Sequence, residues 1–191
     1  QRNALEGKHI LVAIDSWPVD SKFPLGHYLK TLGKMGDKST EIEVIMLEHD
    51  VAHESFSGDV LACLPPPDWT ITEENSIGRR DLRDLPVLSI DPPNCKDIDD
   101  ALHSRTLSNG NYEVGVHIAD VTHFLLPGTA MDKEASNRST ATYLVGKRLD
   151  MIPGLLSETL CSLKQGQDRF AFSVLWEITP TGDIVNVDFF K

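Results

Sequence analysis

The sequence predicts a mixed α+β protein made of two modules. Strand-like runs alternate with short helical runs in both halves of the chain. An Asn-Gly pair between two alternating runs at 101–118 is a strong hairpin signal. A proline-rich and polar stretch at 65–84 has the composition of a linker. With 191 residues, of which 40% are apolar, the chain is long enough to bury a core.

The first module, residues 1–64, suits a small β-barrel such as an OB fold. Glycines and prolines separate apolar runs that are each the length of one strand or one short helix. The expected elements are a buried strand at 8–17, a strand at 26–33, a helix at 40–47 and a helix capped by Ser55 or Ser57 that ends near Leu64.

The second module, residues 85–191, begins after the linker at 65–84. Its pattern mixes hairpins with helices, and two turn sequences, 108–111 and 179–183, join neighbouring strands. The expected elements are a strand at 87–90, strands at 101–107 and 112–118, a helix at 131–140, an extended segment at 143–145, a helical segment at 153–163, and strands at 169–178 and 184–190.

The composition limits the classes of function. The net charge of −11 argues against non-specific binding of nucleic acid through a basic surface. A bound metal ion would, however, invert the local electrostatic field. No apolar run approaches the roughly 20 residues of a membrane span, so we expect no membrane association. Three cysteines without paired metal spacing predict free thiols, and therefore an intracellular, reducing compartment.

Four aspartates within ten residues, Asp91, Asp97, Asp99 and Asp100, are the main candidate site. Crowded carboxylates must protonate, meet a cation or lie in solvent. Mg²⁺ prefers such oxygen ligands, and Pro92 and Pro93, directly after Asp91, stiffen the turn that follows it. The alternative is a solvated acidic loop. An EF-hand is excluded, because its positions 6 and 12 would be lysine and leucine rather than glycine and glutamate.

For the other polar residues we favour structural roles. His117 and His123 lie near Asp120, so a metal site is conceivable, but we favour structural hydrogen bonds for the histidines and a helix cap for Asp120. Cys95 lies between the aspartates with no histidine near it in sequence, which favours a space-filling thiol over a nucleophile.

Tyr143 lies beside two basic residues, Lys147 and Arg148. An aromatic ring near cations can stack on a base while the cations meet phosphates. From the residues alone, a core tyrosine with basic neighbours is the simpler interpretation.

Three blocks of the sequence, taken in order, resemble the opening of the catalytic RNB domain of the RNase II and RNase R exoribonucleases. They are Ser89-Ile90-Asp91-Pro92-Pro93 through Asp97-Ile98-Asp99-Asp100-Ala101-Leu102, then Glu113 to Phe124 (EVGVHIADVTHF), then Leu160-Cys161-Ser162-Leu163. The first 64 residues are similar to the second cold-shock domain that precedes RNB in these enzymes. Within the family, the chain is most similar to the branch that contains the catalytic subunit of the eukaryotic RNA exosome.

The resemblance implies a processive, hydrolytic 3′→5′ exoribonuclease that degrades single-stranded RNA to 5′-nucleoside monophosphates. It implies that Asp91, Asp97, Asp99 and Asp100 are catalytic residues that hold Mg²⁺, or Mn²⁺ in its place, and that Tyr143 stacks on a base near the 3′ end. Asp99 is expected to matter most. The implied partners are single-stranded RNA and the exosome core subunits, in the nucleus and also in the cytoplasm.

The resemblance also implies that this chain is a fragment, because the later part of the RNB domain and its catalytic arginine are missing. We therefore expect weak or no catalysis by the isolated fragment. Two other functions stay open: an RNA-binding module without cleavage, and a scaffold segment that contacts other exosome subunits.

Overall fold

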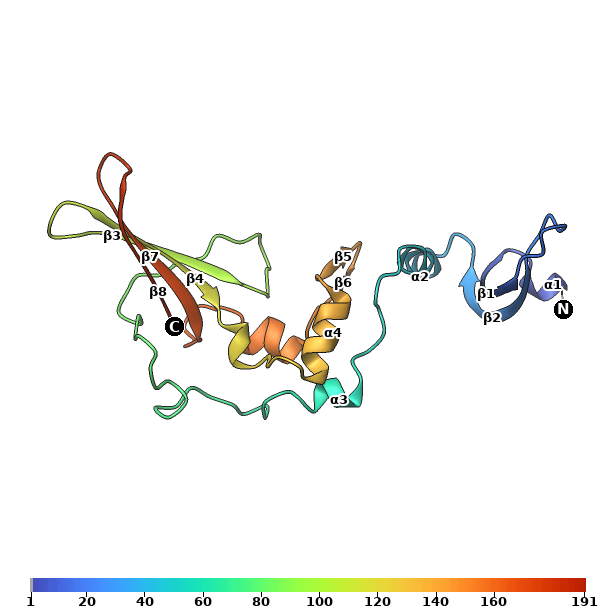
Figure 1. Ribbon diagram of the computed structural model, residues 1–191, viewed down its shortest axis with the longest axis horizontal. Helices are drawn as coiled ribbons and strands as arrows, with labels where there is room; N and C mark the ends of the chain where they lie inside the picture. The colour runs from blue at the N-terminus through green and yellow to red at the C-terminus, as the bar shows by residue number, and fades with distance from the viewer. Residues whose placement is uncertain (1) are drawn as a thin grey trace. The chain divides into compact units, whose positions relative to one another are not determined.

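The computed structural model describes residues 2–191 and divides into two compact units, whose elements are traced in Figure 1. The first unit comprises the residues up to Ser55 together with Tyr143–Leu149. The second unit comprises Phe56–Thr142 together with Asp150–Lys191. Both units contain helices or strands of the predicted types, which confirms the mixed α+β class.

The first unit is built on an antiparallel pair of strands, and the two strands and the helix predicted there are confirmed as elements. The strand at 8–17 was expected to be buried, which is wrong, because its residues alternate between exposed and half-buried in a two-stranded sheet. Asp37 begins the helix by accepting a hydrogen bond from the amide of Thr40. A short hairpin from later in the chain lies almost entirely in this unit. The elements are α1 (Arg2–Leu5), β1 (Lys8–Ser16), β2 (Leu25–Lys34), α2 (Lys38–Glu48), β5 (Thr142–Leu144) and β6 (Lys147–Leu149). Helix α1 was not predicted, because four residues are too few to show a helical period.

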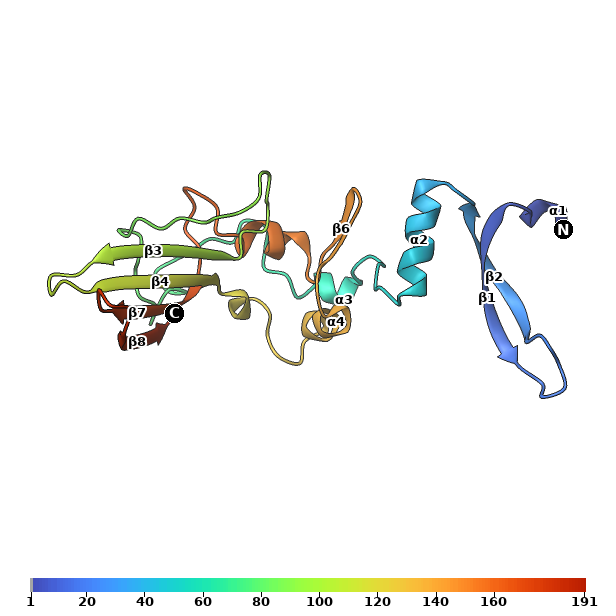
Figure 2. The same cartoon turned by 90° about the horizontal axis from the view of Figure 1, so that it is seen from above.

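The second unit contains a four-stranded antiparallel sheet in the order β3-β4-β7-β8, seen from above in Figure 2. Its strands are β3 (Asp100–Thr106), β4 (Tyr112–Ala119), β7 (Ala171–Ile178) and β8 (Ile184–Phe190). Both predicted hairpins are confirmed. In the first, Gly110 adopts a φ of 86°, a conformation that glycine reaches without a steric penalty.

The strand expected at 87–90 is wrong. Only Leu88 pairs there, through an isolated bridge to Leu102 of β3, with backbone hydrogen bonds of 2.7 and 2.9 Å. Pro86 and Pro92 lie on either side of the bridge. Proline has no N–H to donate, so Pro86, two residues before Leu88, cannot continue the ladder toward the N-terminus.

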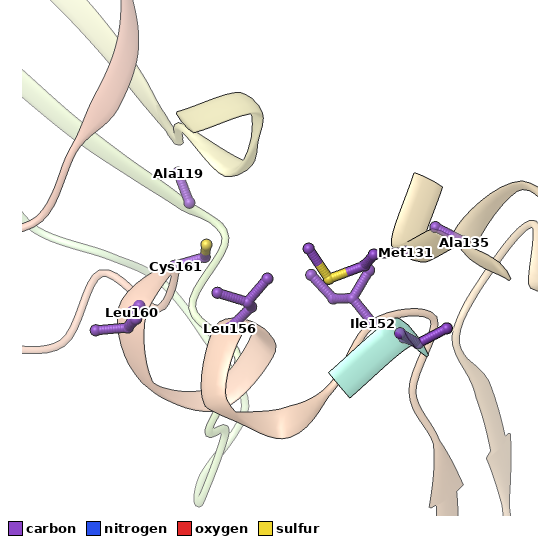
Figure 3. Packing of buried hydrophobic residues seen from close by; sticks show 8 residues of the cluster. Ala119, Met131, Ala135, Ile152, Leu156, Leu160 and Cys161 are labelled. Carbon is purple, nitrogen blue, oxygen red and sulfur yellow. The ribbon is translucent and has the colours of Figure 1, made fainter. Parts of the chain in front are cut away.

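The core of the second unit lies beside the end of β4, where short helices pack together (Figure 3). These are α3 (Gly58–Leu61), the 3₁₀ turn η1 (Val121–His123), α4 (Ala130–Arg138) and the π-helical turn η2 (Leu156–Leu160). Ser57 caps α3 and Thr129 caps α4. The buried apolar residues are Val60, Ala119, Met131, Ala135, Ile152, Leu156, Leu160 and Cys161.

The helical segment predicted at 153–163 is confirmed, in π form. The amide of Cys161 donates to the carbonyl of Leu156 at 2.9 Å, which is the i→i+5 bond of a π turn. None of the helices within residues 2–191 is both long and apolar enough to cross a membrane.

Candidate functional site

The four aspartates lie on one short segment that leads into the sheet. Asp91, Asp97 and Asp99 precede β3, and Asp100 is the first residue of that strand. Asp91 and Asp97 are half-buried, whereas Asp99 and Asp100 are exposed. The segment therefore presents carboxylates both to solvent and to the protein interior, rather than forming a fully solvated loop.

A tight turn follows Asp91. The amide of Cys95 donates to the carbonyl of Pro92 at 3.1 Å, and Asn94 adopts a left-handed conformation with φ of 67°. Proline fixes its own φ, and asparagine tolerates the left-handed region better than most residues. The stiffened turn predicted from the two prolines is thus present, and it reverses the chain between Asp91 and Asp97.

The C-terminal end of the segment is fixed to the sheet. The carbonyl of Asp99 accepts a hydrogen bond of 2.9 Å from the amide of Ala119, at the end of β4. Asp100 lies opposite Ile118 in the β3–β4 ladder. Because β4 pairs on both sides, with β3 and β7, the backbone of Asp99 and Asp100 is attached to the interior of the sheet.

One oxygen of Asp91 lacks a partner. Oδ2 of Asp91 is buried and accepts no hydrogen bond from the residues that the structure describes. A buried carboxylate oxygen without a partner is costly, and native proteins satisfy most such atoms with a donor, a water molecule or an ion. A hard divalent cation is a ligand that this oxygen fits.

Within residues 2–191, no three His, Cys, Asp or Glu side chains are gathered closely enough to hold a metal ion. The four aspartates share a segment but do not converge as a finished cluster. Their role as the set of metal ligands therefore stays a prediction.

Cys95 behaves as the expected space-filling thiol. Its Sγ lies 3.6 Å from both the carbonyl oxygen and Oδ1 of Asp97. Burial raises the pKa of the Cys95 thiol, and neighbouring carboxylates add to that effect. A raised pKa disfavours the thiolate, which is the nucleophilic form.

His117 is buried in a chain of hydrogen bonds, as the structural interpretation predicted. Nε2 of His117 lies 2.7 Å from Nδ1 of His103, and Nδ1 of His117 lies 2.8 Å from Oγ of Ser173. His103 in turn contacts Glu113 at 3.2 Å. Burial lowers the pKa of His117, and so does the nearby charge of His103 when that ring is protonated. These contacts occupy both ring nitrogens of His117.

Asp120 occupies the N-cap position of η1, but its side chain does not bond to the backbone of that turn. It accepts hydrogen bonds from Arg79 at 2.6 Å, Lys191 at 3.1 Å and Thr122 at 2.6 Å. Burial opposes ionisation of Asp120, yet these three donors outweigh it and lower the pKa of the carboxyl. The capping prediction is therefore wrong about the side chain, because two cations compete for the carboxylate.

His123 does not join His117 and Asp120. Its ring packs at 4.7–5.5 Å, between centroids, against the rings of Trp69, Phe124 and Phe170. Burial lowers the pKa of His123, and the charge of Arg79 contributes. This aromatic packing favours the neutral ring and supports a structural role.

Tyr143 lies on β5, in the first unit, with its side chain largely exposed at 69%. Lys147 and Arg148 lie on the paired strand β6. The core interpretation of Tyr143 is therefore wrong. Stacking of its ring on a base stays a prediction. The four aspartates lie in the second unit.

Ser162 lies in the third sequence block, and no role was predicted for it. The hydroxyl of Ser162 donates to the carbonyl of Lys96 at 2.7 Å and accepts from the amide of Ile98 at 3.0 Å. The only signal in the sequence was its place in that block, because nothing local connects positions this far apart.

Comparisons with known proteins agree with these observations. The model of the RNB domain matches residues 79–191, and the model of the Dis3-like cold-shock domain 2 matches residues 1–50. The mouse protein named exosome complex exonuclease RRP44 is 56% identical over 191 residues, which cover 100% of this chain and 20% of the relative.

Two solved structures extend the likeness. RNase R of Mycoplasma genitalium, in complex with ribose-methylated single-stranded RNA, matches with a TM-score of 0.86 and 27% identity, over 96% of this chain and 28% of that chain. Yeast Ssd1, described as a pseudonuclease, matches with a TM-score of 0.76 and 25% identity, over 99% of this chain and 24% of that chain. The RNB model covers more than half of the sequence, in the part that carries the acidic segment, and the chain belongs to the RNB family.

Proposed function

We propose that the protein is a hydrolytic 3′→5′ exoribonuclease that degrades single-stranded RNA processively and releases 5′-nucleoside monophosphates. The observation that carries this proposal is the acidic segment Asp91–Asp100, tied to the sheet within an RNB-family domain. The mouse relative is named an exonuclease, and the RNase R structure holds RNA. The chain spans 20% of that relative's length, so the activity proposed is that of the whole protein.

Four carboxylates would hold the metal. The partnerless buried Oδ2 of Asp91 and the exposed side chains of Asp99 and Asp100 supply the hard oxygen ligands that Mg²⁺ or Mn²⁺ requires, with Asp97 beside them. When bound, the ion supplies activation of a water and stabilisation of the leaving 3′-oxygen. Asp99 is the central residue of this set, because its carbonyl anchors the segment to β4 while its side chain stays exposed.

Tyr143 would receive a base near the 3′ end of the RNA. An exposed aromatic ring stacks on any base, which gives affinity without sequence preference. Lys147 and Arg148 on the paired strand would meet phosphates. This local basic group lets RNA bind although the net charge of the chain is −11.

The partners proposed are single-stranded RNA and the core subunits of the RNA exosome, since the mouse relative is named as part of the exosome complex. That relationship also supports a nuclear location, with a cytoplasmic pool. The division of the chain into a cold-shock domain at 1–64, a linker at 65–84 and the start of the RNB domain at 85–191 is part of the same proposal.

The test is 3′ trimming of a labelled single-stranded RNA by the full-length protein and by Asp99→Asn. The wild type is expected to release mononucleotides in the presence of Mg²⁺, and Asp99→Asn to bind the RNA with similar affinity without releasing them. Asp84→Asn is the matched control, because it removes an equal charge from an exposed aspartate outside the segment. If the wild type binds RNA and releases no mononucleotide, the proposal is wrong.

The second candidate is a non-catalytic RNA-binding module or a scaffold segment of the exosome. The likeness to Ssd1, a pseudonuclease, favours it, because this fold also occurs without nuclease activity. It predicts RNA binding, or binding to exosome subunits, that is independent of Mg²⁺ and unchanged in Asp99→Asn. The same trimming assay, run beside a binding assay, separates the two candidates.

A further inference from the structure

Ser162 is completely buried, and its hydroxyl makes two hydrogen bonds to the acidic segment. Its exposed fraction is 0%. The hydroxyl donates its only proton to the carbonyl of Lys96, at 2.7 Å, and accepts from the amide of Ile98, at 3.0 Å. One side chain thus bridges two backbone groups on either side of Asp97.

The backbone of Ile98 is fixed on both of its polar groups. Its amide meets the Ser162 hydroxyl, and its carbonyl accepts from the amide of Leu163 at 2.8 Å. Asp97 and Asp99 are its two chain neighbours. The carbonyl of Lys96 and the amide and carbonyl of Ile98 belong to three successive planar peptide units, so fixing these groups orients the backbone on both sides of Asp97 and on the N-terminal side of Asp99.

The backbone of Ser162 is also fixed by hydrogen bonding. The guanidinium of Arg169 donates from Nε to the carbonyl of Ser162 at 3.1 Å and to the carbonyl of Thr159 at 2.9 Å. The π turn η2 ends just before Ser162, with Leu160 and Cys161 in the core. The serine therefore joins the acidic segment to a packed and hydrogen-bonded part of the protein.

We propose that Ser162 is a positioning residue, which sets the backbone of Asp97–Asp99 so that these carboxylates are ready for a divalent cation. The consequence for catalysis rests on the proposed function, whereas the effect of Ser162 on the backbone of the acidic segment does not. Outer groups that orient metal ligands typically change metal affinity or activity by about 10- to 100-fold when they are lost. The hydroxyl would act through the two backbone groups to which it bonds.

Ser173 provides a matched control for the loss of a buried hydroxyl. It is 2% exposed, and its Oγ bonds to His117 at 2.8 Å rather than to the acidic segment. Ser162→Ala and Ser173→Ala therefore remove the same group from equally buried sites in one unit. Ser162→Cys is the second variant, because it fills the space of serine and offers only a weak donor.

The experiment measures three quantities on the full-length protein. Amide-resolved hydrogen exchange reports on Ala119, whose amide donates to the carbonyl of Asp99. Mn²⁺ titration followed by electron paramagnetic resonance reports the affinity of the segment for a cation. Steady-state trimming of single-stranded RNA separates kcat from KM.

For Ser162→Ala and Ser162→Cys, the expected results are faster exchange at Ala119, Mn²⁺ affinity lower by about tenfold, and reduced kcat with unchanged KM. Ser173→Ala is expected to change the melting temperature alone. Equal effects of Ser162→Ala and Ser173→Ala on exchange at Ala119 would overturn the inference, whatever the activity. If exchange at Ala119 is faster in Ser162→Ala than in Ser173→Ala while the wild type trims no RNA, the positioning role is sustained and the proposed function is refuted.

Discussion

Arg79 and Asp120 form a buried ion pair, with 2.6 Å between Nη2 and Oδ2 and side chains only 13% and 1% exposed. The guanidinium of Arg79 also lies over the ring of Phe170, 3.8 Å from the ring centroid. Asp120 directly follows the end of β4, the strand that anchors the acidic segment. The pair therefore fixes the chain before the RNB sheet to the end of β4, the strand that anchors the acidic segment.

Removal of this pair is expected to destabilise the second unit strongly. Arg79→Met leaves a buried carboxylate with fewer donors, and breaking a buried pair costs about 3 kcal/mol of unfolding free energy. Arg80→Met is the control, because Arg80 pairs with Asp188 through side chains that are 46% and 45% exposed. That pair contributes less than about 1 kcal/mol. Urea unfolding of both variants tests the difference, and equal losses would contradict the buried pair.

Stability is expected to fall between pH 6.5 and 5.5 because of His117, which is buried, and His123, which is half-buried. Burial lowers the pKa of His117 and of His123 in the folded protein. Below the ordinary histidine pKa, about 6.5, these histidines are protonated in the unfolded chain but stay neutral in the folded protein. Their contribution to stability is therefore fully present above this pH and is lost as the pH falls toward the lowered pKa.

The loss that His117 causes is limited to about 1 kcal/mol over that interval. The charged and titratable groups in contact with this chain of bonds are His103, Glu113 and Arg105. Urea unfolding at both pH values is expected to show a smaller change for His117→Gln than for the wild type. An identical pH slope in the two proteins would count against the lowered pKa.

Gly115 is expected to tolerate no side chain. A Cβ at this position would collide with the ring of His103 and would lie 2.7 Å from Cδ2 of Leu175. Gly115→Ala therefore forces the buried histidine to move, at a cost of about 1–3 kcal/mol. Gly154→Ala is the matched control, because its Cβ would meet nothing within 4 Å. Thermal unfolding should separate the two variants, and similar melting temperatures would show that the sheet face adapts.

Much of the local structure was predictable, because it depends on local chemistry. The Asn109-Gly110 turn predicted the β3–β4 hairpin, and Ser57 was one of two caps proposed for α3. The prediction of a strand at 87–90 failed because its apolar residues suggested a strand while Pro86 beside it offers no backbone donor. The aspartates were found from their density alone.

The supporting contacts were not predictable, because they join residues far apart in the chain. Ser162 bonds to residues 64 and 66 positions away, and Arg79 pairs with Asp120 across 41 positions. Arg79 lies in the stretch whose composition predicts a linker, and nothing in that composition reveals a buried partner. Such pairings depend on the three-dimensional arrangement of the sheet and the π turn rather than on any sequence period.

The binding of Mn²⁺ to the full-length protein and to Asp91→Asn, followed by electron paramagnetic resonance, tests most directly whether the acidic segment holds a divalent cation. Oδ2 of Asp91 is buried without a partner among the residues described here, so we expect loss of its charge to weaken binding at least about tenfold. Equal Mn²⁺ affinity in the two proteins, with both folded, would contradict the role given to this carboxylate and to the segment that carries it.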